Sequence, residues 1–197
     1  MEHKILERMQ PYRCSHITFD YAKEGWQESG YRNLRKEVFC REQQMFEGTD
    51  EDAIDFHALP IVALDEYMGS LPNVIAGVRI DERQPGVWWG SRLCVSSDYR
   101  NHRHFRTHLL FDDDTEHSIF ALSIGSALIF KAVTTANYLG CKQFFAHVQT
   151  QNERLFQRLH WARVKEVTLD GYPHVLMEAD LSHYPPSAFA QALARAV

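Results

Sequence analysis

Three pieces of the segment from Gly86 to Trp161 decide the fold: Ser91-Arg-Leu-Cys-Val-Ser-Ser-Asp-Tyr-Arg100, Ile124-Gly-Ser-Ala-Leu128 and Asn152-Glu-Arg-Leu-Phe-Gln-Arg-Leu-His-Trp161. The run over 87–95 predicts a central strand. Residues 124–139 are apolar on most sides and stop at Gly140, which predicts a buried helix. A strand over 142–148 and a short helix over 152–160 complete the segment.

The rest of the chain extends this pattern in both directions. Residues 15–21 alternate and predict a first strand, and 30–44 have the spacing of an amphipathic helix. Apolar runs at 56–64 and 74–80, joined by turn-forming residues, predict a hairpin. Asp170-Gly171 predicts another hairpin between 163–169 and 172–179. We expect one mixed α/β domain over 1–197, with a long insertion loop at 97–122 and a C-terminal tail at 185–197.

The composition is that of an ordinary globular protein. The chain has 197 residues, of which 45% are hydrophobic, and its formal net charge of −5 argues against a nucleic-acid partner. Its four cysteines lie far apart without a CxxC pair, and no run reaches the roughly 20 apolar residues of a membrane span. The N-terminus lacks the apolar core of a signal peptide. We expect a cytoplasmic protein with no membrane partner and leave a homodimer open.

The start of the helix at 124–139 is a candidate anion site. Gly125 and Ser126 lie in its first turn, where unpaired N–H groups and the helix dipole favour a phosphate. Small residues at a helix start also serve close packing, so both interpretations stay open.

Together, the three quoted pieces resemble the core of the GNAT superfamily of acyltransferases. The resemblance implies a mostly antiparallel sheet of about seven strands with helices on both faces, and acetyl-CoA or a longer acyl-CoA as donor. It implies that the backbone of Leu93, Cys94 and Val95 binds the pantetheine, with an N–H near Val95 stabilising the thioester oxygen. The resemblance further implies that the rest of the cofactor, including its pyrophosphate, is bound by five other positions: Arg100, Arg103, Gly125, Ser126 and Asn152.

A closer resemblance within the superfamily is to the acyl-homoserine-lactone synthases. The matching positions are Arg35, Phe39, Asp50, Asp52, Asp55, Arg79 and Arg92. Trp89 stands where those synthases have a glutamate, so we favour a similar bacterial group, the N-acyltransferases of nitrilase gene clusters. Phe156 stands where most GNAT enzymes have a tyrosine acid. The resemblance implies that Arg35, Phe39, Asp52, Arg79 and Arg92 bind the substrate.

Amine acylation needs a general base with a pKa near the working pH. His147, on the strand before Asn152, is the first candidate, and His57, Asp55 and Asp52 are others. An alternative is at least as well supported: His147 could face the other side of the sheet and have only a structural role as a hydrogen-bonded histidine. Cys94 as a nucleophile is the weaker hypothesis because its neighbours are apolar.

Two charged segments have alternative interpretations. Residues 47–55 are expected to form a solvated acidic loop, whose aspartates could hold a cationic amine or pair with Arg35, Arg79 and Arg92. The loop with His102, His104, His108 and His117 lacks a fixed metal-ligand spacing. We expect no metal and interpret this loop as a lid over the thioester.

Three functions fit these observations. The first is direct acyl transfer from acyl-CoA, or from an acyl-carrier protein, to the amine of a small molecule. The second is a non-catalytic module that binds a CoA thioester and regulates a partner. The third is autoinducer synthesis from S-adenosylmethionine, for which the glutamate replaced by Trp89 would be needed.

Overall fold

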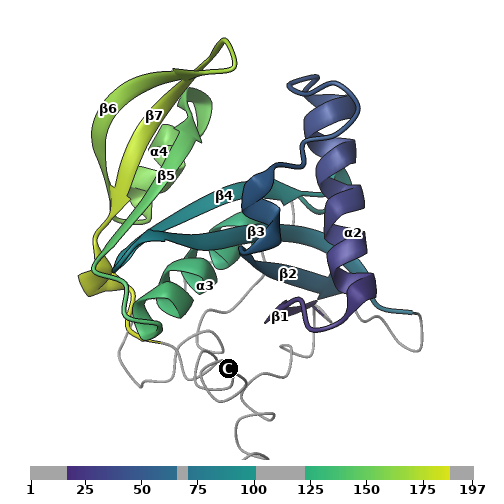
Figure 1. Cartoon of the computed structure of the whole chain (residues 1–197), viewed down its shortest axis with the longest axis horizontal. Coiled ribbons are helices and arrows are strands. Elements are labelled where there is room, and N and C mark those ends of the chain that lie inside the picture. The colour runs from purple at the N-terminus through teal and green to yellow at the C-terminus, as the bar shows by residue number, and fades with distance from the viewer. Residues whose placement is uncertain (1–16, 66–70, 101–122, 187–197) are drawn as a thin grey trace, which may run out of the picture.

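A computed structural model of the chain describes residues 17–65, 71–100 and 123–186. Seven strands form one sheet in the order β1-β2-β3-β4-β5-β7-β6, antiparallel throughout except for the parallel pair β4 and β5 (Figure 1). The elements are β1 (Ile17–Tyr21), α2 (Gly25–Arg35), β2 (Leu59–Asp65), β3 (Asn73–Gln84), β4 (Val87–Val95), α3 (Ile124–Tyr138), β5 (Gln143–Gln149), α4 (Glu153–Arg158), β6 (Trp161–Leu169) and β7 (Tyr172–Ala179). The mixed α/β class and the mostly antiparallel sheet agree with the sequence-based expectation.

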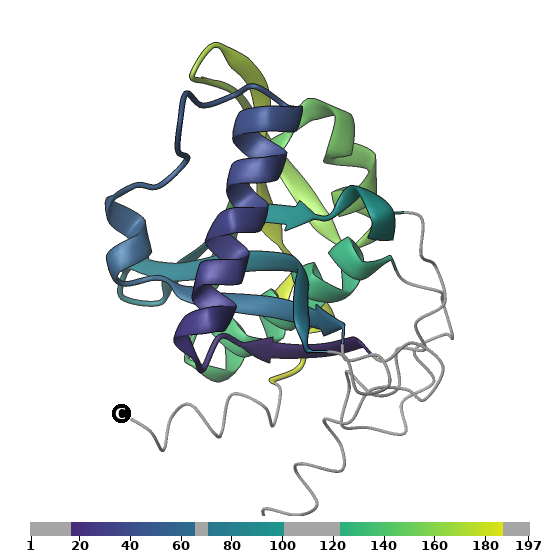
Figure 2. The ribbon, with the colours of Figure 1, turned by 90° about the vertical axis from the view of Figure 1, so that its right-hand side faces the viewer.

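Helices cover both faces of the sheet. Alternate residues of β2 divide between two hydrophobic clusters, because successive side chains of a strand point to opposite faces. Ile61 and Ala63 join the cluster that contains α3, whereas Val62 and Leu64 join the cluster that contains Tyr31 of α2. Figure 2 looks onto α2, which crosses the sheet on the second face.

Helix α3 is apolar on most sides because the molecule encloses it. Eleven of its residues are buried, including Leu128, Ala132 and Val133. The chain leaves the helix at Gly140, whose φ of +94° is readily adopted only by glycine. The Asp170-Gly171 hairpin is also as predicted, since both residues have positive φ, the geometry of a type I′ turn.

The first helix differs from the prediction at both ends. It begins at Gly25 instead of residue 30, with Glu24 and Gln27 forming a capping box. After Arg35 the backbone continues as a π-helical segment, Lys36–Glu42. Such segments are rare and occur often at functional sites. Apolar spacing alone does not distinguish them from an α-helix.

The acidic segment 47–55 is not the solvated loop that the sequence suggested. Asp50 is buried, and residues Ala53–Phe56 form a turn of 3-10 helix that Asp52 caps by accepting a hydrogen bond from the N–H of Ile54. Charged side chains enter the interior here because arginines neutralise them, as described below.

Strands β4 and β5 are paired for only part of their length. Their register runs from Val87 opposite Gln143 to Gly90 opposite Ala146, and no pair is recorded beyond. The remaining halves of the two strands therefore form the two arms of a fork. We call the opening between them the fork.

Several predictions lie outside the described residues. These are most of the insertion loop, including Arg103 and its four histidines, and the tail after residue 186. Within the described part of the chain, no helix combines the length and the hydropathy that a bilayer span requires.

Candidate active site

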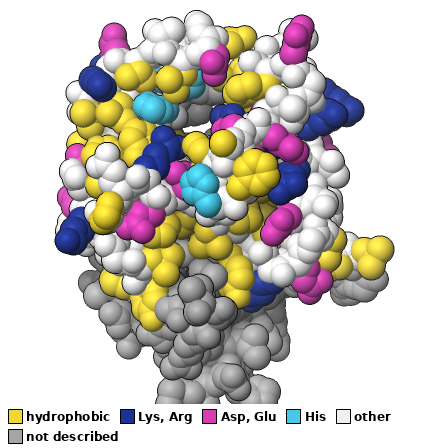
Figure 3. Space-filling model, viewed as in Figure 1, with side chains coloured by type: hydrophobic (Ala, Val, Ile, Leu, Met, Phe, Trp, Pro, Cys, Tyr) yellow, Lys and Arg dark blue, Asp and Glu magenta, His cyan; other side chains and the backbone are white. Residues whose placement is uncertain are grey.

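The fork holds a cavity of about 270 Å³. Its lining comes from β4 and β5, from the segment after the π-helix, and from α3, α4 and the β6–β7 hairpin. In Figure 3 the surface is hollowed between the two halves of the molecule, and basic, histidine and hydrophobic side chains lie around the hollow. A concave site at a break in a sheet is a common place for a ligand.

A β-bulge shapes the β4 arm of the fork. Arg92 and Leu93 together stand opposite Val78, and Arg92 has a φ of +54°. The hydroxyl of Tyr31 donates a hydrogen bond to the Arg92 carbonyl at 2.7 Å. Bulges bend a strand and interrupt its ladder. Helix α2 thus braces the point at which β4 turns away from β5.

The backbone that the sequence assigned to the donor lies along this arm. Leu93 lines the cavity, whereas Val95, at the end of the β4 arm beside the first turn of α3, is not among the lining residues. The Cys94 side chain points the other way, into the cluster under α2. Burial raises the pKa of the Cys94 thiol well above its usual range, which disfavours the nucleophile hypothesis.

The first turn of α3 meets the end of β4. A methyl group on Gly125 would lie 3.7 Å from Val95 Cγ2. Ser123 caps the helix by accepting a hydrogen bond from the Ser126 N–H at 3.2 Å. The structure thus brings Val95, Gly125 and Ser126 together. Arg100 lies at the same end of β4, where it donates to the Val95 carbonyl at 2.9 Å and pairs with Glu42.

Four of the five substrate-binding positions implied by the resemblance, all but Phe39, join Asp50 and Asp55 in a cluster of six charges, here called the Arg–Asp cluster. Its members are Arg35, Arg79, Arg92, Asp50, Asp52 and Asp55. Arg35 and Arg79 are each 1% exposed, and their hydrogen-bond and ion-pair partners are the acids of the cluster, the Asp50 carbonyl and Ser91. Three positive and three negative groups balance, as buried charges require.

Two arginines of this cluster each donate a pair of hydrogen bonds to one aspartate. Arg79 donates to both carboxylate oxygens of Asp52 at 2.7 and 2.6 Å, and Arg35 donates to those of Asp55 at 2.5 and 3.0 Å. Burial would raise the pKa of each carboxyl, but hydrogen bonds from the arginines lower both values overall. Neither group is suited to accept a proton near neutral pH. Of the two interpretations of segment 47–55, the structure contains the one in which its aspartates pair with arginines.

His147 faces the cavity from β5. Its ring centroid lies 4.9 Å from that of Trp89, and His174 lines the same cavity. Burial lowers the pKa of His147, and the positive charges of Arg83, His174 and Lys165 lower it further. This lowering favours the neutral imidazole, the form that can accept a proton. His57 is exposed and is not among the residues that line the cavity.

The base of the fork is apolar. Phe156 and Trp161 are buried there with their rings edge to face at 5.0 Å. Asn152 lines the cavity at the start of α4, and Phe39 lines it from the π-helical segment. Phe156 carries no proton to donate, so a leaving group must take its proton from another source.

Sequence reasoning missed several lining residues. Gln43, Met45 and Phe46 reach the cavity from the segment after the π-helix, and Arg83 and His174 reach it from β3 and β7. No local motif marks these positions. Among the described residues, no group of three or more histidine, cysteine or acidic side chains is placed to hold a metal ion.

At the level of sequence, no family model and no curated protein matches this chain. At the level of structure, it is similar to a Lactobacillus plantarum protein assigned as an N-acetyltransferase, with 18% identity and a TM-score of 0.64 over 83% of this chain and 97% of the other. An acyl-CoA N-acyltransferase from Pseudomonas aeruginosa has 20% identity and a TM-score of 0.59 over 83% and 98%. The acyl-homoserine-lactone synthase LasI has 11% identity and a TM-score of 0.56 over 83% and 89%.

These similarities establish the fold. The chain has the GNAT fold, which confirms at the level of fold the resemblance drawn from Ser91–Arg100 and its companion segments. Activity does not follow from fold alone.

Proposed function

We propose that this protein is an N-acyltransferase that moves an acyl group from acyl-CoA to the amine of a small molecule. One observation carries the proposal: the fork between β4 and β5 opens beside a bulged strand and the first turn of α3. Such a fork offers free strand backbone to an extended thioester arm and helix N–H groups to its phosphates.

The donor arm would lie along β4. Backbone groups of Leu93 to Val95 would bind the pantetheine, and an N–H near Val95 would stabilise the carbonyl oxygen as it gains charge. Gly125 and Ser126 would face the pyrophosphate. Arg100 supports this placement less directly, because Glu42 already pairs with its guanidinium.

The reaction is a direct attack. The neutral amine nitrogen forms a bond to the thioester carbon, and the carbon–sulfur bond then breaks to release the thiolate. His147 accepts the proton that the nitrogen loses and then releases it to solvent, and the thiolate takes up a proton from solvent because Phe156 has none to give. The products are an amide and free CoA, and no enzyme-bound acyl intermediate is involved.

Thiol release measured across a panel of acyl-CoAs and amines tests this proposal. We expect amine-dependent release of one CoA per amide formed, with mass spectrometry identifying the product. An acyl-carrier protein loaded with the same chain serves as the alternative donor. If neither CoA nor acyl-carrier protein binds, the proposal is wrong.

A second candidate is a regulatory module that binds a CoA thioester without turnover. Phe156 in place of the tyrosine acid favours it. Tight binding of CoA together with no release on any amine would support this alternative over the enzyme. Autoinducer synthesis from S-adenosylmethionine is less supported, since Trp89 packs against His147 where a glutamate would be needed.

A further inference from the structure

A second β-bulge places Arg83 at the cavity. Glu82 pairs with Trp88 and Gln84 with Val87, so Arg83 is the extra residue of β3 at this point. A bulge can redirect a side chain. The guanidinium of Arg83 lies 4.4 Å from the centre of the Trp89 ring, and Arg83 lines the cavity.

One end of this guanidinium is anchored and the other is open. Its Nε donates to Asp81 at 2.8 Å, and the Asp81 side chain is fully buried, which fixes the orientation of the arginine. The Arg83 side chain itself is 35% exposed. Within the described part of the chain, its two Nη atoms have no recorded partner. Two parallel N–H donors of this kind match the geometry of a carboxylate.

The proposed base lies on the same aromatic ring. Trp89 contacts both the Arg83 guanidinium and the His147 imidazole, with centroid distances of 4.4 and 4.9 Å. A carboxylate-binding group and a proton acceptor therefore both border the Trp89 ring, and both line the same cavity. An acceptor that carries a carboxylate and an amine on one short molecule could use both groups.

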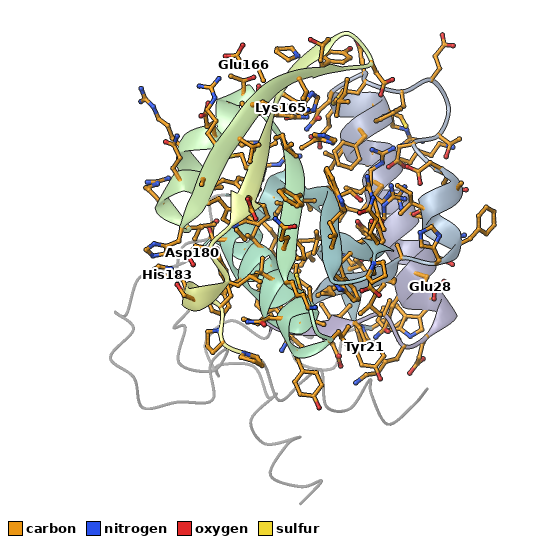
Figure 4. The ribbon with its side chains drawn as sticks, turned by 60° about the vertical axis from the view of Figure 1, so that its left-hand side comes forward. Tyr21, Glu28, Lys165, Glu166, Asp180 and His183 are labelled. Atoms are coloured by element: carbon orange, nitrogen blue, oxygen red, sulfur yellow. The ribbon has the colours of Figure 1, made fainter. Side chains whose placement is uncertain are left out.

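The charges facing His147 favour an anionic ligand. Two cations, Arg83 of β3 and Lys165 of β6, act on His147 with positive charge; Lys165 is labelled in Figure 4. Asp170 lines the cavity at the β6–β7 turn, and both oxygens of Asp52 are held by Arg79. A purely cationic amine would meet repulsion here that a carboxylate on the same molecule would offset.

We propose that the acyl acceptor is an amine that carries a carboxylate, of the amino-acid class, with the carboxylate on Arg83 and the amine facing His147. This inference rests on the proposed acyl transfer and names its acceptor.

Matched acceptors give the decisive test. Each amino acid of a panel is compared with its primary amide, which keeps the amine and removes the negative charge. We expect the acid to have a kcat/KM at least about tenfold higher than the amide in the wild-type enzyme. In Arg83→Gln the ratio of acid to amide kcat/KM should fall to about one through a higher KM for the acid, while the KM for acyl-CoA stays unchanged. Any effect of the lost charge on His147 acts on both acceptors alike and leaves this ratio untouched.

Two further variants separate recognition from folding. Arg83→Gln leaves the Asp81 carboxylate buried without its cation, so the double variant Arg83→Gln/Asp81→Asn removes both charges and should also lose the preference. Arg41→Gln removes an arginine exposed on the π-helical segment, away from the cavity lining, and should retain it.

The outcomes distinguish this inference from the proposed function. Equal rates with acid and amide, or a preference that survives in Arg83→Gln, would overturn the inference and leave acyl transfer standing. If no amine is acylated, a thermal-shift titration with the same acid and amide pairs tests the carboxylate site directly. Stabilisation by the acid in the wild type but not in Arg83→Gln would support a carboxylate site without acyl transfer. No stabilisation and no transfer would remove both proposals.

Discussion

The residue that the proposed chemistry uses most directly is His147. Its place beside Trp89 and near Arg83 and His174 favours the neutral imidazole, because burial and positive neighbours both oppose protonation. A neutral imidazole can take a proton from an attacking amine without first losing one.

We expect His147→Gln to lower kcat by about 10²- to 10⁴-fold, the usual contribution of a general base. In the wild type, kcat/KM should fall as the pH drops through the pKa of His147, which burial and the neighbouring positive charges lower. The variant should lack this acidic limb. A pH–rate profile of both proteins checks the prediction, and an unchanged limb in His147→Gln, or its loss in His57→Gln, would contradict it.

The Arg–Asp cluster gives a prediction about stability. Asp55→Asn removes the negative charge that Arg35 and Arg79 share and replaces one of its two acceptor oxygens by a donor, and breaking a buried pair costs about 3–5 kcal/mol of unfolding free energy. Urea denaturation measures the loss. Glu51→Gln, at an exposed position of the same segment, is the matched control and should change stability by less than about 0.5 kcal/mol.

The Arg–Asp cluster also predicts how the stability of the protein changes at low pH. Burial would raise the pKa of Asp55, but hydrogen bonds and positive charge from Arg35 and Arg79 hold it well below its usual range. A depressed folded-state pKa contributes stability that is present above the unfolded pKa and lost as the pH falls through the folded one. Wild-type stability should therefore fall below about pH 4, and Asp55→Asn should show a weaker dependence in that window.

At the scale of elements, the contact between α2 and the bulge of β4 controls the shape of the fork. Tyr31 packs on Gly77, where a methyl group would come within 2.4 Å of its ring. The same tyrosine holds the Arg92 carbonyl through its hydroxyl. The absence of a side chain at residue 77 is therefore what lets α2 brace the bulge.

We expect Gly77→Ala to destabilise the protein by about 1–3 kcal/mol through overpacking, and to weaken CoA binding because Tyr31 must move away from Arg92. Gly25→Ala is the control, since nothing lies within 4 Å of the added methyl group. Chemical denaturation and CoA titration measure the two effects. If Gly77→Ala lowers the free energy of unfolding by the same amount in a Tyr31→Ala background, the clash with the Tyr31 ring is not the cause.

At the scale of the whole molecule, the sheet consists of two parts. Strands β1 to β4 form one part and β5 to β7 the other, and the recorded β4–β5 register joins them through four residue pairs. A donor that lies in the fork would contact both parts and so link them.

CoA should therefore stabilise the native state. At a concentration one hundred times its Kd, a ligand bound only to the folded protein adds about 2.7 kcal/mol to the free energy of unfolding. Thermal unfolding followed with increasing CoA checks this, with adenosine as a control that lacks the arm predicted to lie along β4. No shift with CoA at any concentration would contradict the placement of the donor.

Local signals in the sequence determined most of the elements. The strand Val87–Val95 and the Asp170-Gly171 turn were predicted to the residue, and α3 to within one residue, because periodicity and turn chemistry depend on neighbouring residues. The quoted motifs also carried the GNAT architecture that the structural similarities confirm.

Only the tertiary structure decided how the candidate site is assembled. The partners in the Arg–Asp cluster lie 15 to 42 residues apart, and the segment 47–55 looked solvated because its cations come from α2, β3 and β4. The bulges at Arg92 and Arg83 depend on cross-strand register, which is set by packing and not by composition. Chain-local patterns therefore specified the strands and helices, while long-range pairing decided which charges meet at the fork.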